Sequence, residues 1–385
     1  MPDQGRKIRV LYLIPSLRTG GAELQLLTLV RGLDKSRFAV SVAVFYEGGF
    51  EQKLKEIAGV HLIRLGKKHG FDPVPFIRLL RELCQYPQDI LHAFNLSARF
   101  IGLLCGRIAH VPIVVLAERT DRPIVTSFGS RLYSRLDGLA LGLADYVIAN
   151  SRGGLRFALQ RGVRAERVSV IPNGIDRQRL LPKRSADEMR SLLKLPKESF
   201  VIGMLGRLEP SKEPERFLAV FEAVARSDAS VRGLVVGDGS SAERLQRKVQ
   251  QLQLGDRLLF VGRQEEPSDF LQIMNVLVHP SLGAEGCPNA VLEAMAMGIP
   301  VIAGRTNGAA EIIDSGRTGV LIESSDPAKW AEAVLRLRDE PELRRRLGEN
   351  ARRRVTRDFS AETMVAAHAE LYEQWYRNAK SRTTR

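Results

Sequence analysis

The 385-residue chain is 44% hydrophobic, which indicates a globular protein of about two or three domains and excludes a largely disordered chain. No apolar run approaches the ~18 residues of a membrane-spanning helix, and the short apolar stretch near the N-terminus lacks a cleavage-site pattern, so we expect a strand there. The formal net charge of +14 is uneven, because residues 1–177 hold 26 Lys and Arg against 15 Asp and Glu. Either an anionic partner or ordinary solvated arginine side chains explains this excess.

Short apolar, β-rich runs alternate with helical patterns through the first half of the chain. The runs predict strands at 8–15, 38–45, 61–65, 89–94, 112–117, 145–150 and 168–174. The clearest helical patterns between them lie at 22–33, 76–85 and 98–109. Apolar strands separated by helices indicate a parallel sheet that is covered on both faces.

The same alternation restarts in the second half. It predicts strands at 199–208, 231–239, 257–263, 276–281, 300–304 and 319–323, and a last helix over 360–380 that packs on a domain. The polar, Pro-flanked stretch 176–196 between the two sets predicts a linker. We therefore expect an α/β protein of two doubly wound, Rossmann-like domains facing each other across a cleft, with the ligand at the carboxyl ends of the strands.

The segment AEGCPNAVLEAMAMG, residues 284–298, is the most informative of the chain. Pro288 fits the first turn of a helix that stops near Gly298, so Glu285 lies in the preceding loop and Glu293 in the second turn. The loop amides and the positive end of this helix favour anionic or hydroxyl-rich ligands. A solvent-facing Glu293 is the ordinary alternative, and its small and apolar neighbours weigh against it.

Two cations, Arg207 and Lys212, fall in a predicted strand-to-helix loop just before a helix that opens at Pro214. Together with free helix amides they predict a diphosphate clamp, and surface charges in a loop are the alternative. Gly20 and Gly21 follow the first strand and permit a phosphate to approach the backbone, but the third glycine of a dinucleotide fingerprint is missing. A tight turn is sufficient to explain VVGDG at 235–239.

The remaining polar signals are weaker. His92 ends a predicted strand, where it either reaches the cleft or is structural, and His279 is expected to be structural. The arginine-rich stretch 344–355 is interpreted as the solvated face of a surface helix rather than a nucleic-acid site. The three cysteines form no metal-binding or disulfide spacing, which favours a reducing cytoplasm.

In their order and spacing these segments resemble the group 1 glycosyltransferases, family 4 of the retaining nucleotide-sugar enzymes. The resemblance covers nearly the whole chain, through TGGAE, DILHAFN, VIANS, VIPNGID, GRLEPSK, LVVGDG, FVGR, EGCPNAVLEAMAMGIPVIA and NGAAEII. Glu285 and Glu293 match the E-x7-E signature of that family. The resemblance implies the GT-B fold, with an acceptor-binding domain at 1–177, a nucleotide-sugar-binding domain at 178–360, and a helix at 361–385 that crosses back to the first domain.

The resemblance also assigns roles to individual residues. Arg207 and Lys212 would bind the donor diphosphate and stabilise the leaving group, so that neither a metal nor a cofactor is expected. Glu285 would contact the donor-sugar hydroxyls and Glu293 the ribose. The other residues expected at the donor are Gly20, Gly21, Arg263, Gly286, Cys287, Pro288 and Asn289.

The chain departs from the family pattern near the sugar. Many members carry a histidine where this chain has Glu118, within AERTD, and a second histidine where it has Phe94. Glu118 is therefore expected either to replace that histidine as a catalytic contact to the sugar or to mark a different donor. These two changes leave the donor identity and the role of His92 open.

The implied activity is a retaining glycosyltransferase that moves one sugar from a UDP-sugar, or less favourably a GDP-sugar. The implied acceptor is a lipid-linked or other anionic glycan in surface polysaccharide or glycolipid assembly, in the cytoplasm or at the inner, anionic face of the plasma membrane. The alternatives are a sugar phosphorylase or epimerase of the same fold, a scaffold that has lost transfer, and a basic nucleic-acid-binding protein. The last is disfavoured, because only 6% of residues are aromatic and no nucleic-acid motif is present.

Overall fold

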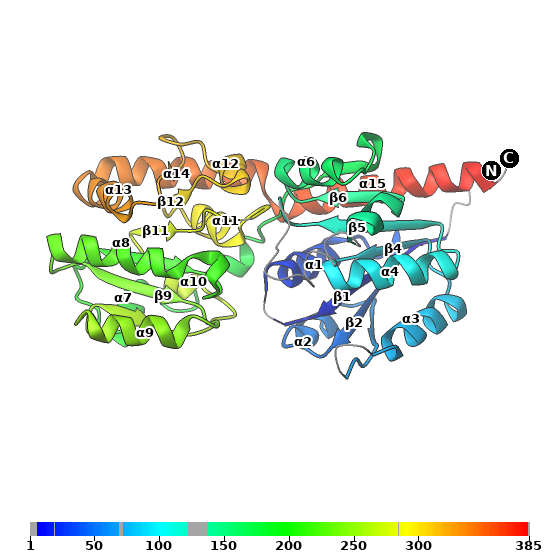
Figure 1. The fold of residues 1–385 in the computed structure, drawn as a ribbon, viewed down its shortest axis with the longest axis horizontal. Helices are drawn as coiled ribbons and strands as arrows, with labels where there is room; N and C mark the ends of the chain where they lie inside the picture. Colours follow the sequence, from blue (N-terminus) through cyan, green and yellow to red (C-terminus); the bar gives the residue numbers. More distant parts are fainter. Residues whose placement is uncertain (1–5, 19, 69–71, 122–136, 284, 384–385) are drawn as a thin grey trace. The chain divides into compact units, whose positions relative to one another are not determined.

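The computed structural model describes residues 6–18, 20–68, 72–121, 137–283 and 285–383. The chain divides into two compact units, the first made of Met1–Gly174 with Ala361–Arg385 and the second of Ile175–Ser360. Each unit is built around one parallel sheet with helices packed against it (Figure 1). The division falls after Gly174, whereas the sequence placed it after residue 177.

The sheet of the first unit contains all seven strands predicted for that half. Its strands are β1 (Ile8–Ser16), β2 (Phe38–Tyr46), β3 (Val60–Arg64), β4 (Ile90–Ala93), β5 (Ile113–Glu118), β6 (Tyr146–Ala149) and β7 (Val168–Val170). They pair in parallel in the order β3-β2-β1-β4-β5-β6-β7. The direction of strand addition reverses between β1 and β4, and in open α/β sheets ligands bind at the carboxyl edge beside such a reversal.

The helices of the first unit include the C-terminal one. They include α1 (Gly21–Gly32), α2 (Glu51–Lys55), α3 (Val74–Gln85), α4 (Leu96–Ile108), α6 (Arg152–Gln160) and α15 (Ala361–Thr383), with a short 3-10 turn η1 (Ala165–Arg167), and residues 137–143 are helical as well. Helix α15 packs on α1, and its Trp375 stacks on Tyr146 of β6 with ring centroids 4.0 Å apart. The predicted return of the last helix to the first domain is therefore confirmed.

The second unit repeats the same topology with six strands. They are β8 (Val201–Leu205), β9 (Arg232–Val236), β10 (Leu258–Phe260), β11 (Val276–His279), β12 (Val301–Gly304) and β13 (Val320–Ile322). The parallel order is β10-β9-β8-β11-β12-β13, so the reversal lies between β8 and β11. The loops that follow these two strands carry the segments singled out in the sequence.

Helices cover this second sheet as well. They are η2 (Gln178–Leu180), α7 (Ala186–Leu192), η3 (Pro210–Lys212), α8 (Pro214–Ser227), α9 (Ala242–Gln251), α10 (Ser268–Leu271), α11 (Asn289–Ala296), α12 (Asn307–Ile312), α13 (Pro327–Asp339) and α14 (Pro341–Asp358). The arginine-rich stretch 344–355 lies in α14, whose Leu347, Ala351 and Val355 are buried. No helix in the described part of the chain has the length and apolar character needed to cross a membrane.

The prediction of a linker at 176–196 was wrong, because this stretch belongs to the second unit. Ser185 and Glu188 form a capping box that starts α7, and Met189 is fully buried in the core. The carboxylate of Asp269 also accepts a 2.6 Å hydrogen bond from the backbone N–H of Lys183. Helix α7 spans only Ala186–Leu192 and buries one residue, Met189, so the apolar pattern of this polar stretch was too short to indicate a packed element.

Candidate functional site

Two loops of the second unit meet at the carboxyl edge of its sheet. Residues 206–213 follow β8 and residues 280–288 follow β11, and these strands are neighbours at the reversal. The hydroxyl of Ser281 donates to the carbonyl oxygen of Ser211 at 3.2 Å, and the backbone N–H of Leu282 donates to the Glu213 carboxylate at 2.8 Å. The fold therefore brings together the segments that carry Arg207, Lys212 and Glu285.

Glu285 lies at the centre of this cluster, and only 7% of its surface is exposed. One carboxylate oxygen forms an ion pair with Lys212, and the other lies 2.5 Å from Nε2 of His279, the last residue of β11. Burial and the charge of Lys212 lower the pKa of His279 to about 3, so its ring is neutral at pH 7. Since a carboxylate only accepts hydrogen bonds, the His279 Nε2–H donates and fixes Glu285 in place.

The two predicted diphosphate-binding cations have different surroundings. Arg207 is exposed, whereas Lys212 is partly buried beside Glu285. Burial and the Arg207 charge lower the pKa of Lys212 to about 8, which leaves the ammonium mostly protonated at pH 7. The backbone of Glu213, between Lys212 and the start of α8, has a left-handed φ of 51°. Such strained residues are common at ligand sites.

Glu293 is buried in α11, with 5% of its surface exposed, so a solvent-facing side chain is excluded. Its carboxylate pairs with Arg179 of η2, a partner that the sequence did not reveal. Burial raises the pKa of Glu293, and the attraction to Arg179 only partly opposes that effect. Helix α11 begins at Asn289, with Pro288 as its N-cap residue rather than in its first turn.

Two glycines let the backbone segments around these loops pack closely. A Cβ on Gly237 would lie 1.8 Å from the carbonyl oxygen of Gly206, and Gly237 has a φ of +147°. A Cβ on Gly308, in α12, would lie 2.1 Å from the carbonyl oxygen of Gly286. The VVGDG turn therefore also packs closely against the loop that carries Arg207. Helix α12 packs in the same way against the loop that carries Glu285.

The remaining residues expected at the donor divide between the units. Gly286, Cys287 and Pro288 are buried on the path into α11, and Arg263 is exposed in the loop after β10. Gly20 and Gly21 belong to the first unit, where Gly20 is the N-cap residue of α1 and Gly21 begins the helix. Within the predicted motifs, Thr19 and Ala284 lie outside the described residues.

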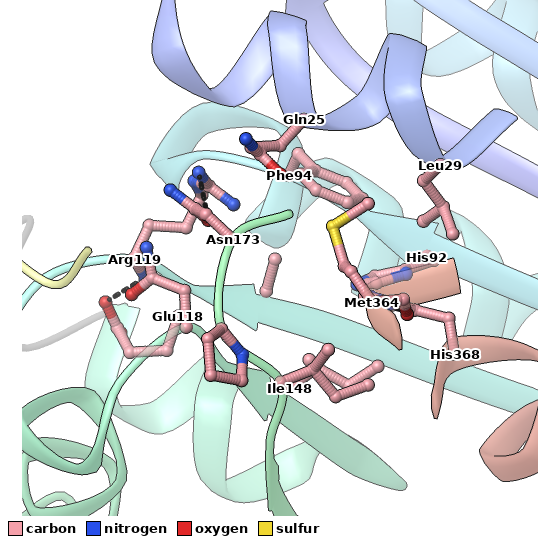
Figure 2. Close-up of a pocket in the computed structure, with 14 residues that line it drawn as sticks. Gln25, Leu29, His92, Phe94, Glu118, Arg119, Ile148, Asn173, Met364 and His368 are labelled. Atoms are coloured by element: carbon pink, nitrogen blue, oxygen red, sulfur yellow. Dashed lines mark hydrogen bonds between the residues drawn. The ribbon is translucent and has the colours of Figure 1, made fainter. Parts of the chain in front are cut away.

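The first unit holds a pocket of its own, at the carboxyl ends of β4, β5 and β6 (Figure 2). His92 is fully buried there, and its Nδ1 lies 2.7 Å from the hydroxyl of Tyr372. Nε2 of His92 and Oδ1 of Asn150, which is also buried, have no hydrogen-bond partner. Burial lowers the pKa of His92 well below its ordinary value and that of His368 to about 4. The pocket therefore presents neutral histidines together with unsatisfied polar atoms.

Glu118 lies at the edge of this pocket, but its carboxylate is occupied within the protein. One oxygen accepts from the backbone N–H groups of Arg119 and Thr120 at 2.9 and 3.0 Å. The other accepts from Arg99 at 2.7 Å. Glu118 thus shapes the turn after β5, from which Arg119 reaches Asn173 at 3.1 Å, as Figure 2 shows. A contact between Glu118 and a sugar stays a prediction.

Arg99 connects Glu118 to a larger buried network. Its second terminal nitrogen donates to Asp137 at 2.9 Å, and Arg161 donates to the same carboxylate oxygen at 2.8 Å. Burial raises the pKa of Asp137 to about 6, against the attraction of both arginines. The charges beneath the first unit's strand ends therefore neutralise one another. Among the described residues, no group of three or more His, Cys, Asp or Glu side chains is arranged to hold a metal ion.

Comparison with known proteins agrees with this architecture. Residues 185–354 match the family model of the group 1 glycosyl transferases, and residues 19–179 match that of glycosyltransferase family 4. A D-inositol 3-phosphate glycosyltransferase of Catenulispora acidiphila is 32% identical over 74% of this chain and 70% of its own length. A UDP-Gal:α-D-GlcNAc-diphosphoundecaprenol α-1,3-galactosyltransferase of Escherichia coli is 28% identical over 78% of this chain and 79% of its own.

Solved structures show the same fold. Anabaena HepE in complex with UDP-glucose superposes with a TM-score of 0.82 at 24% identity, over 95% of this chain and all (100%) of its own. Sucrose-phosphate synthase from Thermosynechococcus elongatus gives a TM-score of 0.80 at 21% identity, over 97% and 100% of the two chains. The GT-B fold predicted from the sequence is confirmed. The family matches and this fold together establish that the chain is a glycosyltransferase of group 1, family 4.

Proposed function

We propose that this glycosyltransferase moves one sugar from a UDP-sugar, with retention of the anomeric configuration, to a lipid-linked or other anionic glycan acceptor. The observation that carries the proposal is the cluster of Arg207, Lys212 and Glu285 at the strand reversal of the second unit. In this proposal the second unit binds the donor and the first unit binds the acceptor.

The cations of the cluster suit a diphosphate. Lys212 precedes the N-terminus of α8, where the helix dipole adds positive potential, and the exposed Arg207 lies in the same loop. When the bond between sugar and phosphate breaks, negative charge develops on the departing diphosphate. Fixed cations in a partly desolvated loop stabilise that charge, which is the role a metal ion has in other transferases. We therefore propose transfer without a metal.

The two glutamates suit the hydroxyls of the donor. Glu285 is held by His279 and has oxygen lone pairs left to accept from sugar hydroxyls. Glu293 is buried, and hydrogen bonds donated by ribose hydroxyls would offset part of its desolvation. The nearby Gly286–Asn289 backbone and Arg263 are proposed to contact the sugar-phosphate and the base.

The names of similar proteins support the finer assignments. The Escherichia coli relative is named for UDP-Gal as its donor and for a diphosphoundecaprenol-linked acceptor. HepE has been solved with UDP and with UDP-glucose. By extension we propose a UDP-sugar and an acceptor at the cytoplasmic membrane face. The net charge of +11 within residues 1–177 favours an anionic acceptor or surface there.

A panel of UDP- and GDP-sugars, measured by thermal shift and by hydrolysis, tests the donor. UDP and at least one UDP-sugar should raise the melting temperature of the wild type, and Glu293→Ala should abolish that shift. Glu332→Ala, which changes an exposed glutamate of the same unit, is the matched control and should behave like the wild type.

Two results would overturn the proposal. The first is that no nucleotide sugar or free nucleoside diphosphate stabilises the protein, which removes the donor assignment. The second is a product whose new glycosidic bond has the anomeric configuration opposite to that of the donor, as read by NMR, which removes retention.

A further inference from the structure

One face of α14 in the second unit (Figure 1) lines an open hollow that is rich in arginine. We call it the arginine hollow, and the side chains that line it are Arg177, Glu349, Arg352, Arg353, Thr356 and Arg357. The other α14 members lie three, four, seven and eight positions after Glu349, so they share one side of the helix. Arg177 comes from the segment before η2. Four guanidinium groups and a hydroxyl therefore line one depression together with a single carboxylate.

Two of the four arginines already have acidic partners. Arg357 donates to the carboxylate of Asp358 at 2.6 and 2.8 Å. Arg353 lies 3.8 Å from one oxygen of Glu349, whose other oxygen accepts from Arg345 at 2.6 Å. These two arginines are balanced within the protein, and by themselves they do not create an anion site.

Arg177 and Arg352 are the unbalanced cations of the arginine hollow. Both side chains are exposed. Within the described ranges, neither guanidinium group has a hydrogen bond or an ion pair with another residue. Single exposed arginines are ordinary, but two unpaired guanidinium groups in one hollow, beside two further arginines, produce a positive potential that favours an anion.

The positive surface continues along α14. Arg353 and Arg357 also line an adjoining hollow, together with Arg317 and Arg354. Arg317 pairs with Asp314 at 3.3 Å, whereas Arg354 donates only to a backbone carbonyl oxygen, at 3.0 Å, in the part of the chain that the structure describes. The acidic side chains that line the two hollows are thus already engaged, and the surface keeps an excess of cations.

The chemistry of the arginine hollow fits a compact anion that carries phosphate groups. A guanidinium group donates two parallel hydrogen bonds to phosphate oxygens, and Thr356 adds a hydroxyl donor. Helix α14 exposes no large apolar or aromatic side chain, so neither insertion into a bilayer nor stacking on nucleic-acid bases is supported. We propose that the arginine hollow binds a soluble anion with two or more phosphate groups, at a site separate from the donor cluster.

The arginine hollow lies beside both segments through which the chain passes between the units. The chain enters the second unit at Ile175 and leaves it after Ser360. Arg177 follows the first crossing and Arg357 precedes the second, and the backbone N–H of Ile175 donates to the carbonyl oxygen of Phe359 at 2.8 Å. An anion held by both Arg177 and α14 therefore ties the two connecting segments together and restrains them.

Calorimetry with inorganic pyrophosphate tests the site. The double variant Arg177→Met, Arg352→Met should bind one equivalent fewer than the wild type, or bind that equivalent at least about tenfold more weakly, because hydrogen bonds between charged groups are lost. Methionine keeps an apolar stem at each position, so circular dichroism melts should be unchanged. The single variant Arg352→Met serves if the double variant is unstable.

The matched control is the double variant Arg247→Met, Arg346→Met. It removes two other exposed arginines of the second unit that lack an acidic partner among the described residues, and it should bind pyrophosphate as the wild type does. Hydrogen exchange adds a second measurement. Pyrophosphate should slow exchange in peptides that cover residues 174–180 and 356–361 of the wild type, but not in those of Arg177→Met, Arg352→Met.

Lys212→Met separates the arginine hollow from the donor cluster, because it should weaken UDP binding and keep the pyrophosphate equivalent of the hollow. Loss of all pyrophosphate binding in Lys212→Met would overturn the proposal. Equal losses in the double variant and its control would also overturn it, since they would show a non-specific effect of charge. An oligonucleotide that binds more tightly than pyrophosphate, in a way that depends on Arg177 and Arg352, would make nucleic acid the ligand instead. Failure of the donor assignment has a different signature, namely a UDP affinity that Lys212→Met leaves unchanged.

Discussion

The two units share one strand order but arrange charge differently at the carboxyl edge of their sheets. In the first unit, Arg99 lies between Glu118 and Asp137, and these charges pair with one another beneath a pocket lined by neutral histidines. In the second unit, Glu285 pairs with Lys212 from the loop after β8. Glu293 pairs with Arg179 of η2, and Arg207 stays exposed. The buried charges are therefore paired in both units, and the second unit differs because it also keeps an exposed cation, Arg207, beside its pairs.

The largest effect is expected from Arg99→Met in the first unit. It leaves Glu118 and Asp137 buried without their shared cation, and breaking a buried pair in this way costs about 3–5 kcal/mol in free energy of unfolding. Denaturant melts followed by Trp375 fluorescence in a Trp330→Phe background report on this unit. Arg164→Met breaks an exposed pair of the same unit and should cost less than about 1 kcal/mol. Equal losses in the two variants would contradict the comparison.

Lys212→Met should separate function from folding in the second unit. Loss of one fixed charge on the leaving group is expected to lower kcat/KM about 100- to 1000-fold. The free energy of unfolding should fall by less than the ~3–5 kcal/mol expected for Arg99→Met, because the Lys212 side chain is partly exposed and Glu285 keeps its bond to His279. Lys329→Met, at an exposed ion pair of the same unit, is the control. Activity within about threefold of the wild type would place Lys212 outside the site.

Glu293→Gln should leave stability unchanged or raise it while it weakens nucleotide binding. Burial raises the pKa of Glu293, so the folded protein holds this proton more tightly than the unfolded chain does, and the ionised form lowers stability above the ordinary pKa of a carboxyl. The neutral amide avoids that cost, and its carbonyl oxygen still accepts a hydrogen bond from Arg179. Loss of charge-assisted hydrogen bonds to ribose should weaken UDP binding about tenfold or more in calorimetry. A destabilised variant with normal UDP affinity would show that Glu293 is structural.

The smallest effect concerns pH. The pKa of Lys212 is lowered to about 8, so its positive charge is present below that pH and is lost as the pH rises through it. UDP affinity should therefore decline as the pH rises above about 8. Lys212→Arg should flatten this decline, because a guanidinium stays protonated. An identical alkaline decline in both proteins would assign it to another group.

The strands and the site loops were predictable because their signals are local. Buried parallel strands appear as apolar runs, and Pro288 and Gly298 indicate the start and the end of the helix over 289–296. The electrostatic partners were not predictable, since they come from distant parts of the chain. Arg179 lies 114 positions before Glu293, and it falls in a stretch whose polarity had suggested a linker.

Glu118 shows the same limit in the first unit. Its position in the family pattern suggested a contact to the sugar, but the carboxylate accepts from Arg99 on another element and from the turn that follows it. His279 is the converse case, because a residue expected to be only structural donates directly to Glu285. Position in a motif identifies the loop, and only the packed structure identifies what each side chain in it contacts.

Hydrogen exchange with and without UDP tests directly whether the cluster of Arg207, Lys212 and Glu285 binds the donor. We expect slower exchange in peptides that cover residues 206–213 and 285–293 of the second unit when UDP is saturating. Peptides that line the pocket of the first unit, around His92 and Asn150, should be less affected. Protection confined to the first unit, or no protection at saturating UDP, would contradict the assignment of the donor site to the cluster of Arg207, Lys212 and Glu285.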